Sequence, residues 1–355
     1  MNQPNPVLTA TAPHGSDTLA RCRDLVTPAL RNAVDRLHPD LARLAAYTFG
    51  WADGDASPRP DGGAGGGKSI RPALALLSAE AVGGAAEAAV PGAVAVELVH
   101  AFSLVHDDIM DGDERRRHRA TVWKAFGIGP ALLVGDALLA LATEVLTRTP
   151  DAVAPAASDL LSGMLVDLAN GQAEDLAFEL RPWTGPEAVT LAEYQRLALL
   201  KTGALLGCAT GLGALLGGAP AEVVSAMTQF GRQLGVAFQA VDDLLGIWGD
   251  PATTGKPVFN DLRARKKTLP VVAALAGSSP AATELAALLG TPHTDERALR
   301  RAAALIDAAG GRTFATEHAR RYLTGAQQSI DAAAVNLTAA AELRRTVAFI
   351  VDRAH

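Results

Sequence analysis

Apolar residues recur along most of this chain at the three-to-four-residue spacing of an α-helix. The helical pattern runs from about Asp17 to Trp51 and then, after residue 68, continues with only short breaks. Alanine and leucine dominate it, and no alternating stretch is long enough to predict a useful strand. Several segments are apolar on more than one face, as expected of helices inside a large bundle. The pattern therefore predicts an all-α fold.

Glycine and proline mark where the helices should end. The predicted breaks are Gly83-Gly84, Gly127 to Pro130, Thr149-Pro150, Trp183 to Pro186, Gly217 to Pro220 and Gly249 to Pro257. The polar residues 1–17 are expected to form a disordered tail, and residues 52–67, rich in glycine and proline, a flexible surface loop. The simplest account is one helical domain over residues 18–355.

Composition narrows the class of protein. The chain has 355 residues, 49% of them hydrophobic, and its net charge of −6 argues against a nucleic-acid partner. Cys22 and Cys208 show no metal-ligand spacing, so we expect two separate thiols in a reducing compartment. Apolar stretches such as residues 203–218 look too short to span a bilayer, and no secretory signal pattern is seen. A cytoplasmic protein without a transmembrane segment is expected.

A first acidic cluster closes the apolar stretch Val96–His106 and reads Asp107-Asp108-Ile109-Met110-Asp111. On a helix, Asp107 and Asp111 share a face and repel each other unless a cation lies between them. The plain alternative is a solvated acidic helix end. A cluster that interrupts a strongly apolar helix instead favours a Mg²⁺ site, because Mg²⁺ prefers oxygen ligands and leaves positions for water or phosphate.

Basic residues follow this cluster at once, in the run Arg115–Arg119. A basic run by itself is usually a solvated surface. Beside a metal-binding acidic cluster, however, it indicates a multiply charged anion, and the planar guanidinium of arginine suits phosphate.

The same composition recurs about 135 residues later in the chain, where an apolar helix leads to Asp242-Asp243. Basic residues again follow, in Gly255-Lys256-Pro257 and in the run Arg263–Lys267. Two such patterns predict two helices that face each other across a cavity, with carboxylates converging on Mg²⁺ ions that bridge a diphosphate.

These residues resemble the motifs of the trans-polyprenyl diphosphate synthases, which include farnesyl and geranylgeranyl diphosphate synthases. The resemblance runs from about residue 20 onward. The matching segments are Gly67-Lys68-Ser69-Ile70-Arg71-Pro72, His100, Asp107 through Asp111, Arg116-Arg117, Lys201-Thr202, Gln239 with Asp242-Asp243, Lys256 and Lys266. The resemblance implies an isoprenoid synthase fold, a single large helical bundle around a central cavity, and a homodimer.

By this resemblance, the functional residues fall into three groups. Asp107, Asp111 and Asp242 would ligate three Mg²⁺ ions, supported by Asp108 and Asp243. The diphosphate of isopentenyl diphosphate would be held by Lys68, Arg71, His100 and Arg117, and the allylic diphosphate by Arg116, Lys201, Lys256 and Lys266. Thr202 and Gln239 would line the path of the carbocation and stabilise it through their oxygen dipoles.

Product length in this family depends on the residues ahead of the first Asp pair. Phe102 and Ser103, five and four residues before Asp107, form a bulky-and-small pair typical of enzymes with C15 or C20 products. Only Ile109 and Met110 separate the aspartates of the first motif, which favours geranylgeranyl over farnesyl diphosphate.

Three positions depart from the family pattern. Gly246 stands where the second motif carries a third Asp, His118 replaces a glycine after the paired arginines, and Phe259 occupies a position that is usually glycine. Since the missing Asp acts mainly through water in the family, we expect weaker affinity for one Mg²⁺ rather than loss of catalysis.

Three alternatives stay open. A terpene cyclase or diphosphate lyase on the same scaffold would ionise a diphosphate but would lose the isopentenyl site. The chain retains the residues of that site together, which argues against this alternative: Lys68, Arg71, His100 and Arg117. A non-catalytic partner subunit of a prenyl synthase would be expected to have lost more of its aspartates. A plain helical scaffold would not explain the recurrence of paired acidic and basic clusters.

Overall fold

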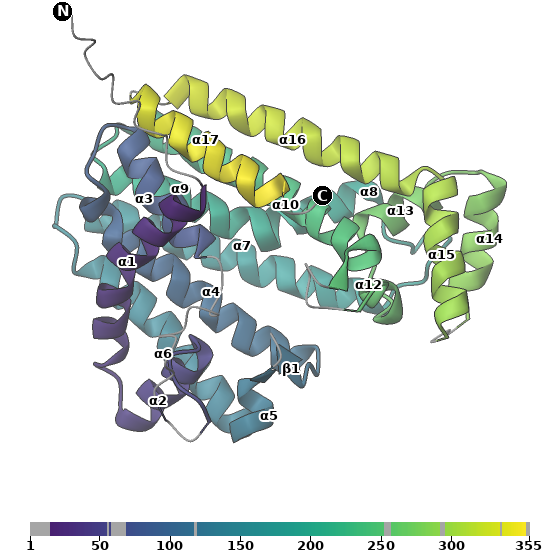
Figure 1. Ribbon diagram of the computed structural model, residues 1–355, viewed down its shortest axis with the longest axis horizontal. Helices are drawn as coiled ribbons and strands as arrows, with labels where there is room; N and C mark the ends of the chain where they lie inside the picture. The colour runs from purple at the N-terminus through teal and green to yellow at the C-terminus, as the bar shows by residue number, and fades with distance from the viewer. Residues whose placement is uncertain are drawn as a thin grey trace, which may run out of the picture.

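A computed structural model describes residues 15–54, 57, 69–116, 119–251, 257–291, 295–333 and 336–352 of the chain. Within these ranges the prediction of an all-α fold is confirmed (Figure 1). The helices are α1 Gly15–Val34, α2 Pro39–Thr48, α3 Ile70–Ala81, η1 Ala86–Ala89, α4 Val90–Met110, α5 Val122–Phe126, α6 Ile128–Thr147, α7 Ala154–Leu180, α8 Leu191–Ala198, η2 Leu199–Gly203, α9 Ala204–Leu216, α10 Ala221–Trp248, α12 Asn260–Arg263, α13 Leu269–Leu275, α14 Pro280–Leu289, α15 Glu296–Ala308, α16 Gly311–Ala333 and α17 Leu337–Asp352.

The helices end close to the glycine and proline breaks that the sequence predicts. α3 ends at Ala81, α7 at Leu180 and α10 at Trp248, each just before a predicted break. The first helical pattern is split into α1 and α2, because Pro39 occupies the first turn of α2 and cannot continue a helix from before it. A two-residue antiparallel ribbon, β1 Arg115–Arg116 with β2 Arg119–Ala120, was not predicted, since so short a pair has no periodicity to detect.

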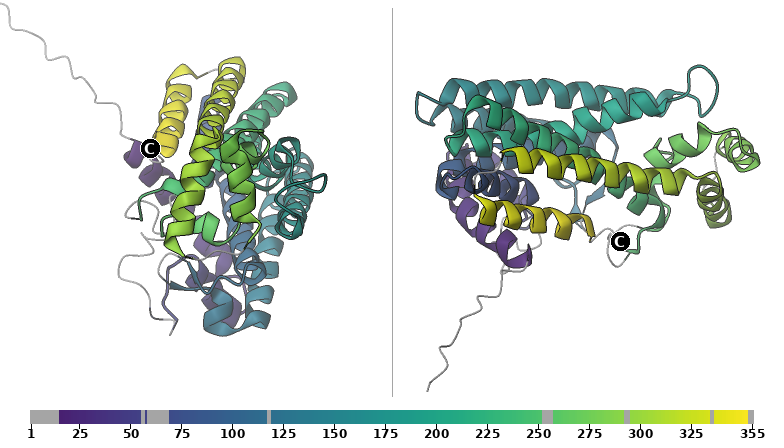
Figure 2. Two further views of the ribbon diagram at one scale, coloured as in Figure 1. Left: turned by 90° about the vertical axis from the view of Figure 1, so that its right-hand side faces the viewer. Right: turned by 90° about the horizontal axis from the view of Figure 1, so that it is seen from above.

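The main core lies where α3, α4, α9 and α10 pack together, and it includes fully buried leucines such as Leu74, Leu98 and Leu212. α10 packs along both α9 and α16, and α16 runs along the length of the bundle (Figure 2, right). A smaller apolar cluster joins α13, α14 and α15 at the end of the molecule away from α1 (Figure 1). These long packed helices form the frame on which the acidic motifs stand.

Small residues let the central helices approach closely. A Cβ on Gly213 of α9 would lie 2.1 Å from the Ala75 carbonyl oxygen of α3, and one on Gly231 of α10 would lie 2.3 Å from the Leu206 carbonyl oxygen. Neither site has room for a side chain. The glycine-rich character of residues 203–218 is therefore a packing requirement.

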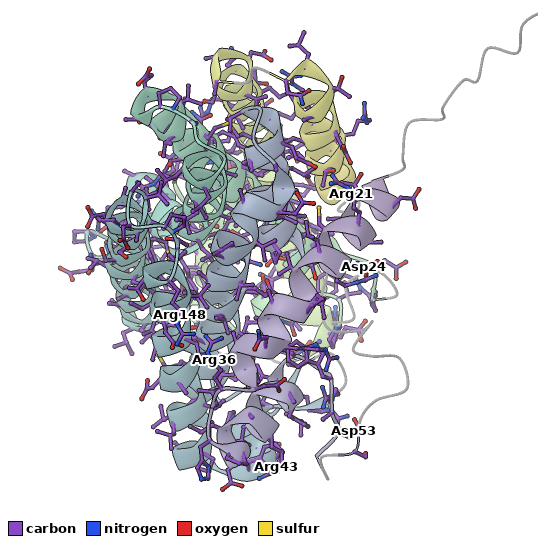
Figure 3. The ribbon with its side chains drawn as sticks, turned by 90° about the vertical axis from the view of Figure 1, so that its left-hand side faces the viewer. Arg21, Asp24, Arg36, Arg43, Asp53 and Arg148 are labelled. Carbon is purple, nitrogen blue, oxygen red and sulfur yellow. The ribbon has the colours of Figure 1, made fainter. Side chains whose placement is uncertain are left out.

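Ion pairs tie α1 to the surface of the bundle (Figure 3). Arg21 donates to both carboxylate oxygens of Glu80 in α3, at 2.7 and 2.9 Å, and reaches Glu342 of α17 at 3.4 Å. Just beyond the other end of α1, Arg36 lies 3.0 Å from Glu144 of α6, which also accepts from Arg148 at 2.5 Å. Such exposed pairs each contribute at most about 1 kcal/mol, so they orient α1 more than they stabilise it.

The two cysteines are separate thiols, as predicted. Cys22 and Cys208 are free and buried, and burial raises the pKa of each thiol to about 12, as expected of inert core residues.

The absence of a transmembrane segment is not confirmed. By length and composition alone, three described helices could cross a membrane: Ala86–Met110, Ile128–Thr147 and Leu191–Leu216. The predicted tail (residues 1–17) lies largely outside the described residues, as does most of the predicted loop (residues 52–67).

Candidate active site

The first acidic cluster forms the carboxyl end of α4. The amide of Asp111 donates to the carbonyl of Asp107 at 2.8 Å, so the helix persists through the cluster and keeps these two aspartates on one face. Asp108 lies on another face, where it is buried and accepts from Arg116 Nε at 2.8 Å and Nη2 at 2.7 Å. Asp108 thus fixes Arg116 of β1 beside the cluster.

The electrostatics of Asp107 are those of a carboxylate that lacks a close counter-ion. Burial raises its pKa to about 6; Lys201 and Arg116 act in the opposite direction, and Asp111 and Asp175 add to the rise. An added cation would therefore relieve both the burial and the repulsion. This is the response expected at an acidic site built for a metal ion.

Lys201 and Thr202 lie in η2, a single π-helical turn between α8 and α9. Lys201 Nζ lies 2.5 Å from Asp175 Oδ2 of α7, which explains how a lysine is tolerated in an apolar segment. Thr202 Oγ1 donates to Gln239 Oε1 of α10 at 2.7 Å. Isolated π turns often mark functional sites, because the extra residue redirects side chains.

The second acidic cluster divides into two different residues. Asp242 is exposed on α10, whereas Asp243 is buried and accepts from the hydroxyl of Tyr194, from the Leu269 amide at 2.7 Å and from Gln239 Nε2 at 2.9 Å. Burial raises the pKa of Asp243 to about 7, against the lowering effect of these three donors. Asp243 therefore joins α8, α10 and α13, and it orients Gln239 so that its carbonyl faces Thr202.

Lys266 connects the second basic segment with the first acidic cluster. It follows α12 in sequence, yet its Nζ lies 3.9 Å from Asp111 Oδ2 at the end of α4. Burial acts to lower its pKa, but Asp111, Asp175 and Asp261 together outweigh burial and raise it. Lys266 therefore lies within the electrostatic influence of carboxylates on α7 and α12 as well as Asp111 at the end of α4.

The other predicted residues are placed as follows. Arg71 lies in the first turn of α3, and His100 lies on α4 seven residues before Asp107, on the same helix face. Phe102 is half-buried with its ring centroid 4.8 Å from that of His106, and Ser103 Oγ donates to the His100 carbonyl at 2.9 Å. Lys68, Arg117 and Lys256 lie outside the described residues, as does His118.

Tyr194 and Asp261 were not predicted as site residues. Asp261 stands two residues before the basic run Arg263–Lys267, and Tyr194 stands seven residues before Lys201. Neither is part of the paired acidic and basic clusters from which the site was predicted, so the sequence did not single them out.

The donor set fits Mg²⁺. Asp107, Asp111 and Asp242 offer only carboxylate oxygens, which suit a hard cation and not a zinc site. Among the described residues, no three such side chains gather closely enough to hold a metal ion by themselves.

Known proteins resemble this chain over most of its length. The farnesyl diphosphate synthase of Mycobacterium bovis is 45% identical over 339 residues, 94% of this chain and 92% of that protein. The geranylgeranyl diphosphate synthase of Mycobacterium tuberculosis is 47% identical over 299 residues, 84% of this chain and 83% of that protein.

Solved structures of polyprenyl synthases also resemble this chain over nearly its whole length. A polyprenyl synthetase from Streptomyces coelicolor matches with a TM-score of 0.88 and 47% identity, covering 94% of this chain and 99% of that one. A polyprenyl synthase from Caulobacter crescentus, complexed with calcium and isoprenyl diphosphate, matches with a TM-score of 0.79 and 27% identity over 97% and 100% of the two chains. The polyprenyl synthetase family pattern itself matches residues 63–306. The chain therefore belongs to the polyprenyl synthetase family of prenyltransferases, as its motifs predicted.

Proposed function

We propose that this chain is a short-chain synthase that condenses isopentenyl diphosphate with an allylic diphosphate to give a C15–C20 product. One observation carries the proposal: Lys201 contacts Asp175 of α7 at 2.5 Å and Lys266 lies 3.9 Å from Asp111 at the end of α4, so ammonium groups and carboxylates alternate in the site. Such an alternation of charges binds a metal–diphosphate complex, which carries both signs.

Mg²⁺ is the proposed metal, with three ions held by Asp107, Asp111 and Asp242. When bound, it neutralises the diphosphate and makes it a better leaving group. The structure with calcium and isoprenyl diphosphate supports the use of a divalent ion in the family.

The side chains of this chain would bind and orient the two substrates. When the allylic diphosphate binds, Lys201 leaves Asp175 and Lys266 leaves Asp111, and both ammonium groups contact the diphosphate instead. Arg116 and Lys256 complete the allylic diphosphate site. Lys68, Arg71, His100 and Arg117 hold isopentenyl diphosphate so that its double bond faces the allylic carbon.

The reaction then proceeds in three steps: ionisation, condensation and loss of a proton. The allylic C–O bond breaks and its electron pair leaves with the diphosphate, the isopentenyl double bond forms the new C–C bond, and a proton passes to the departed diphosphate. Thr202, which donates to Gln239, is left with its oxygen lone pairs as acceptors and stabilises the cation.

The choice between the two product lengths is a separate proposal. Relatives of both kinds match this chain at similar identity. The bulky Phe102 with the small Ser103 favours a shallow pocket, and the short spacing of the first motif favours geranylgeranyl diphosphate.

A homodimer is proposed from exposed apolar side chains on two helices that pack together, α6 and α7. The α6–α7 patch consists of Ile128, Leu132 and Leu133 on α6 and Val166 on α7, and Leu133 and Val166 are 57% and 60% exposed. Such a patch is unfavourable in water and is typical of an interface. A cytoplasmic location stays a prediction.

The function is tested by incubating the purified protein with isopentenyl diphosphate, Mg²⁺ and C5, C10 or C15 allylic diphosphates, and measuring product length by chromatography. We expect elongation with at least one primer and none without Mg²⁺. Asp107→Ala should abolish turnover. Hydrocarbon release without elongation would instead support a cyclase, and inactivity with every primer would support a non-catalytic subunit.

A further inference from the structure

A chain of four hydrogen-bonded side chains begins at Tyr194, a buried residue of α8. The Tyr194 hydroxyl donates to Asp243 Oδ2, and Gln239 Nε2 donates to Asp243 Oδ1 at 2.9 Å. At the other end of the Gln239 amide, Oε1 accepts from Thr202 Oγ1 at 2.7 Å. The chain thus connects a buried phenol with the threonine that is proposed to stabilise the carbocation.

Asp243 determines the direction of the hydrogen bonds in this chain. A carboxylate oxygen only accepts, so the end of the Gln239 amide that faces Asp243 must be its nitrogen. The other end is then the amide oxygen, to which the Thr202 hydroxyl donates, and the Thr202 lone pairs are left for the cation. A flipped Gln239 amide would donate to Thr202 instead. The Thr202 proton would then be free to face the cation, which it would destabilise.

Tyr194 helps to hold the Asp243 carboxylate in the orientation that this direction requires. The terminal torsion of an aspartate is soft, so the plane of its carboxylate depends on its hydrogen bonds. Asp243 Oδ2 accepts from both the Tyr194 hydroxyl and the Leu269 amide, the latter at 2.7 Å. These two donors come from α8 and α13, and they leave Oδ1 to face Gln239.

The helices fix both ends of the chain relative to each other. Tyr194 and Thr202 lie eight residues apart on the continuous helical segment α8–η2, and Gln239 and Asp243 lie four residues apart on α10 (Figure 1). α10 packs against both α8 and η2, so the side-chain bonds close a ring between the two segments. The first turn of α8 is itself held by the capping box of Thr190.

Packing alone does not explain the Tyr194–Asp243 pair. The two side chains are 3% and 4% exposed, and Tyr194 belongs to an apolar cluster of α8, α10 and α13. Burial raises the pKa of Asp243 to about 7 and that of Tyr194 well above its ordinary value, so ionising either group there is unfavourable. A pair of apolar side chains could fill the same space without this penalty. The polar pair therefore indicates a role in orientation.

We propose that Tyr194 is a positioning residue for the condensation, which acts through Asp243 and Gln239 to keep the Thr202 proton directed away from the carbocation. The inference rests on the proposed function, because it requires a cation beside Thr202. Tyr194 should affect the rate of the chemical steps, and the binding of the metal–diphosphate complex should not depend on it.

The test measures the single-turnover rate of condensation with the primer that the wild type elongates. Tyr194→Phe keeps the ring and removes only the hydroxyl. It should slow condensation about tenfold or more, the usual effect of losing a hydrogen bond to a charged group. Binding of inorganic pyrophosphate with Mg²⁺, measured by isothermal titration calorimetry, should stay within about twofold of the wild type. Tyr322→Phe, in the same apolar cluster, removes a hydroxyl outside this chain and is the matched control that should change neither quantity.

A double-mutant cycle gives the decisive comparison. Thr202→Val removes the hydroxyl at which the chain ends. If Tyr194 acts through Thr202, then Tyr194→Phe should slow the Thr202→Val enzyme by less than about threefold. A folding defect would slow both backgrounds by the same factor, so the cycle separates positioning from misfolding.

Three results would overturn the inference: Tyr194→Phe that condenses at the wild-type rate, equal slowing in the two backgrounds, or a loss of pyrophosphate binding in Tyr194→Phe. A wild-type protein that elongates no primer would overturn the proposed function itself. The two failures are distinguishable, because the three results above are obtained with an active wild type.

Discussion

His318 is a buried histidine of α16 whose two ring nitrogens have different surroundings. Nδ1 lies 2.9 Å from Arg321 Nη2, and because a guanidinium can only donate, Nδ1 must accept and the ring must be neutral. Nε2 is buried without a hydrogen-bond partner. Burial, followed by the charge of Arg321, lowers the pKa of His318 to about 4.

This residue should make the fold sensitive to acid. In the unfolded chain a histidine takes up its proton near pH 6.5, whereas in the folded chain His318 resists protonation until about pH 4. The unfolding free energy should therefore fall as the pH drops between these values. His318→Gln keeps an acceptor for Arg321 but does not titrate. From pH 7 to about pH 4.5, urea unfolding should show the wild type losing about 2 kcal/mol more than the variant; parallel losses would contradict the assignment.

Phe102 bears on product length through its size. Its ring is half-buried against His106 on the helix that ends in the first acidic cluster. Phe102→Ala removes the bulk at this height, so products should lengthen by at least one C5 unit with the same primer. Ser103→Ala is the matched control, since it keeps a small side chain and loses only a hydroxyl bonded within its own helix. Chromatography of the products measures their length. An unchanged product length for Phe102→Ala would show that another residue forms the floor of the pocket.

At the scale of elements, the π turn η2 depends on close contact with α7. A Cβ on Gly171 of α7 would lie 2.7 Å from the amide nitrogen of Lys201. Because the obstacle is backbone, a side chain at 171 must displace the turn that carries Lys201 and Thr202.

Gly171→Ala should therefore reduce kcat at least tenfold and destabilise the fold by about 1–3 kcal/mol. Gly163→Ala lies on the same helix with no atom within 4 Å of its new Cβ, so it should leave activity intact. An alanine there should stabilise the helix slightly. Kinetics and thermal unfolding of both variants test the contact, and equal behaviour of the two would exclude it.

At the scale of the molecule, the α6–α7 patch predicts association. Leu133→Glu places a charge among these apolar side chains and should convert a dimer to a monomer, as measured by light scattering after size-exclusion chromatography. Leu180→Glu, at a more exposed leucine at the end of α7, should remain dimeric. A wild-type monomer would contradict the homodimer, and a requirement for detergent would point instead to a membrane-facing patch on α6.

Much of the fold and part of the site were open to prediction. Helix ends are local, decided by proline, glycine and periodicity, so α3, α7 and α10 end where the chain indicates. Asp107 and Asp111 are likewise local, since four residues on a helix put them on one face. The ribbon at Arg115–Ala120 was not predictable, because its pairing is too short to leave a pattern.

The sequence by itself determined which residues carry charge and at what spacing, because these are properties of single helices and their ends. Only the tertiary structure decided what each aspartate does. Asp243 repeats the chemistry of Asp242, yet packing of α8 and α13 encloses it in hydrogen bonds. The Asp261 carboxylate lies beside Gly246 of α10 only because α12 folds back against that helix. Contacts between helices remote in sequence depend on how the whole bundle closes, and no local pattern encodes that.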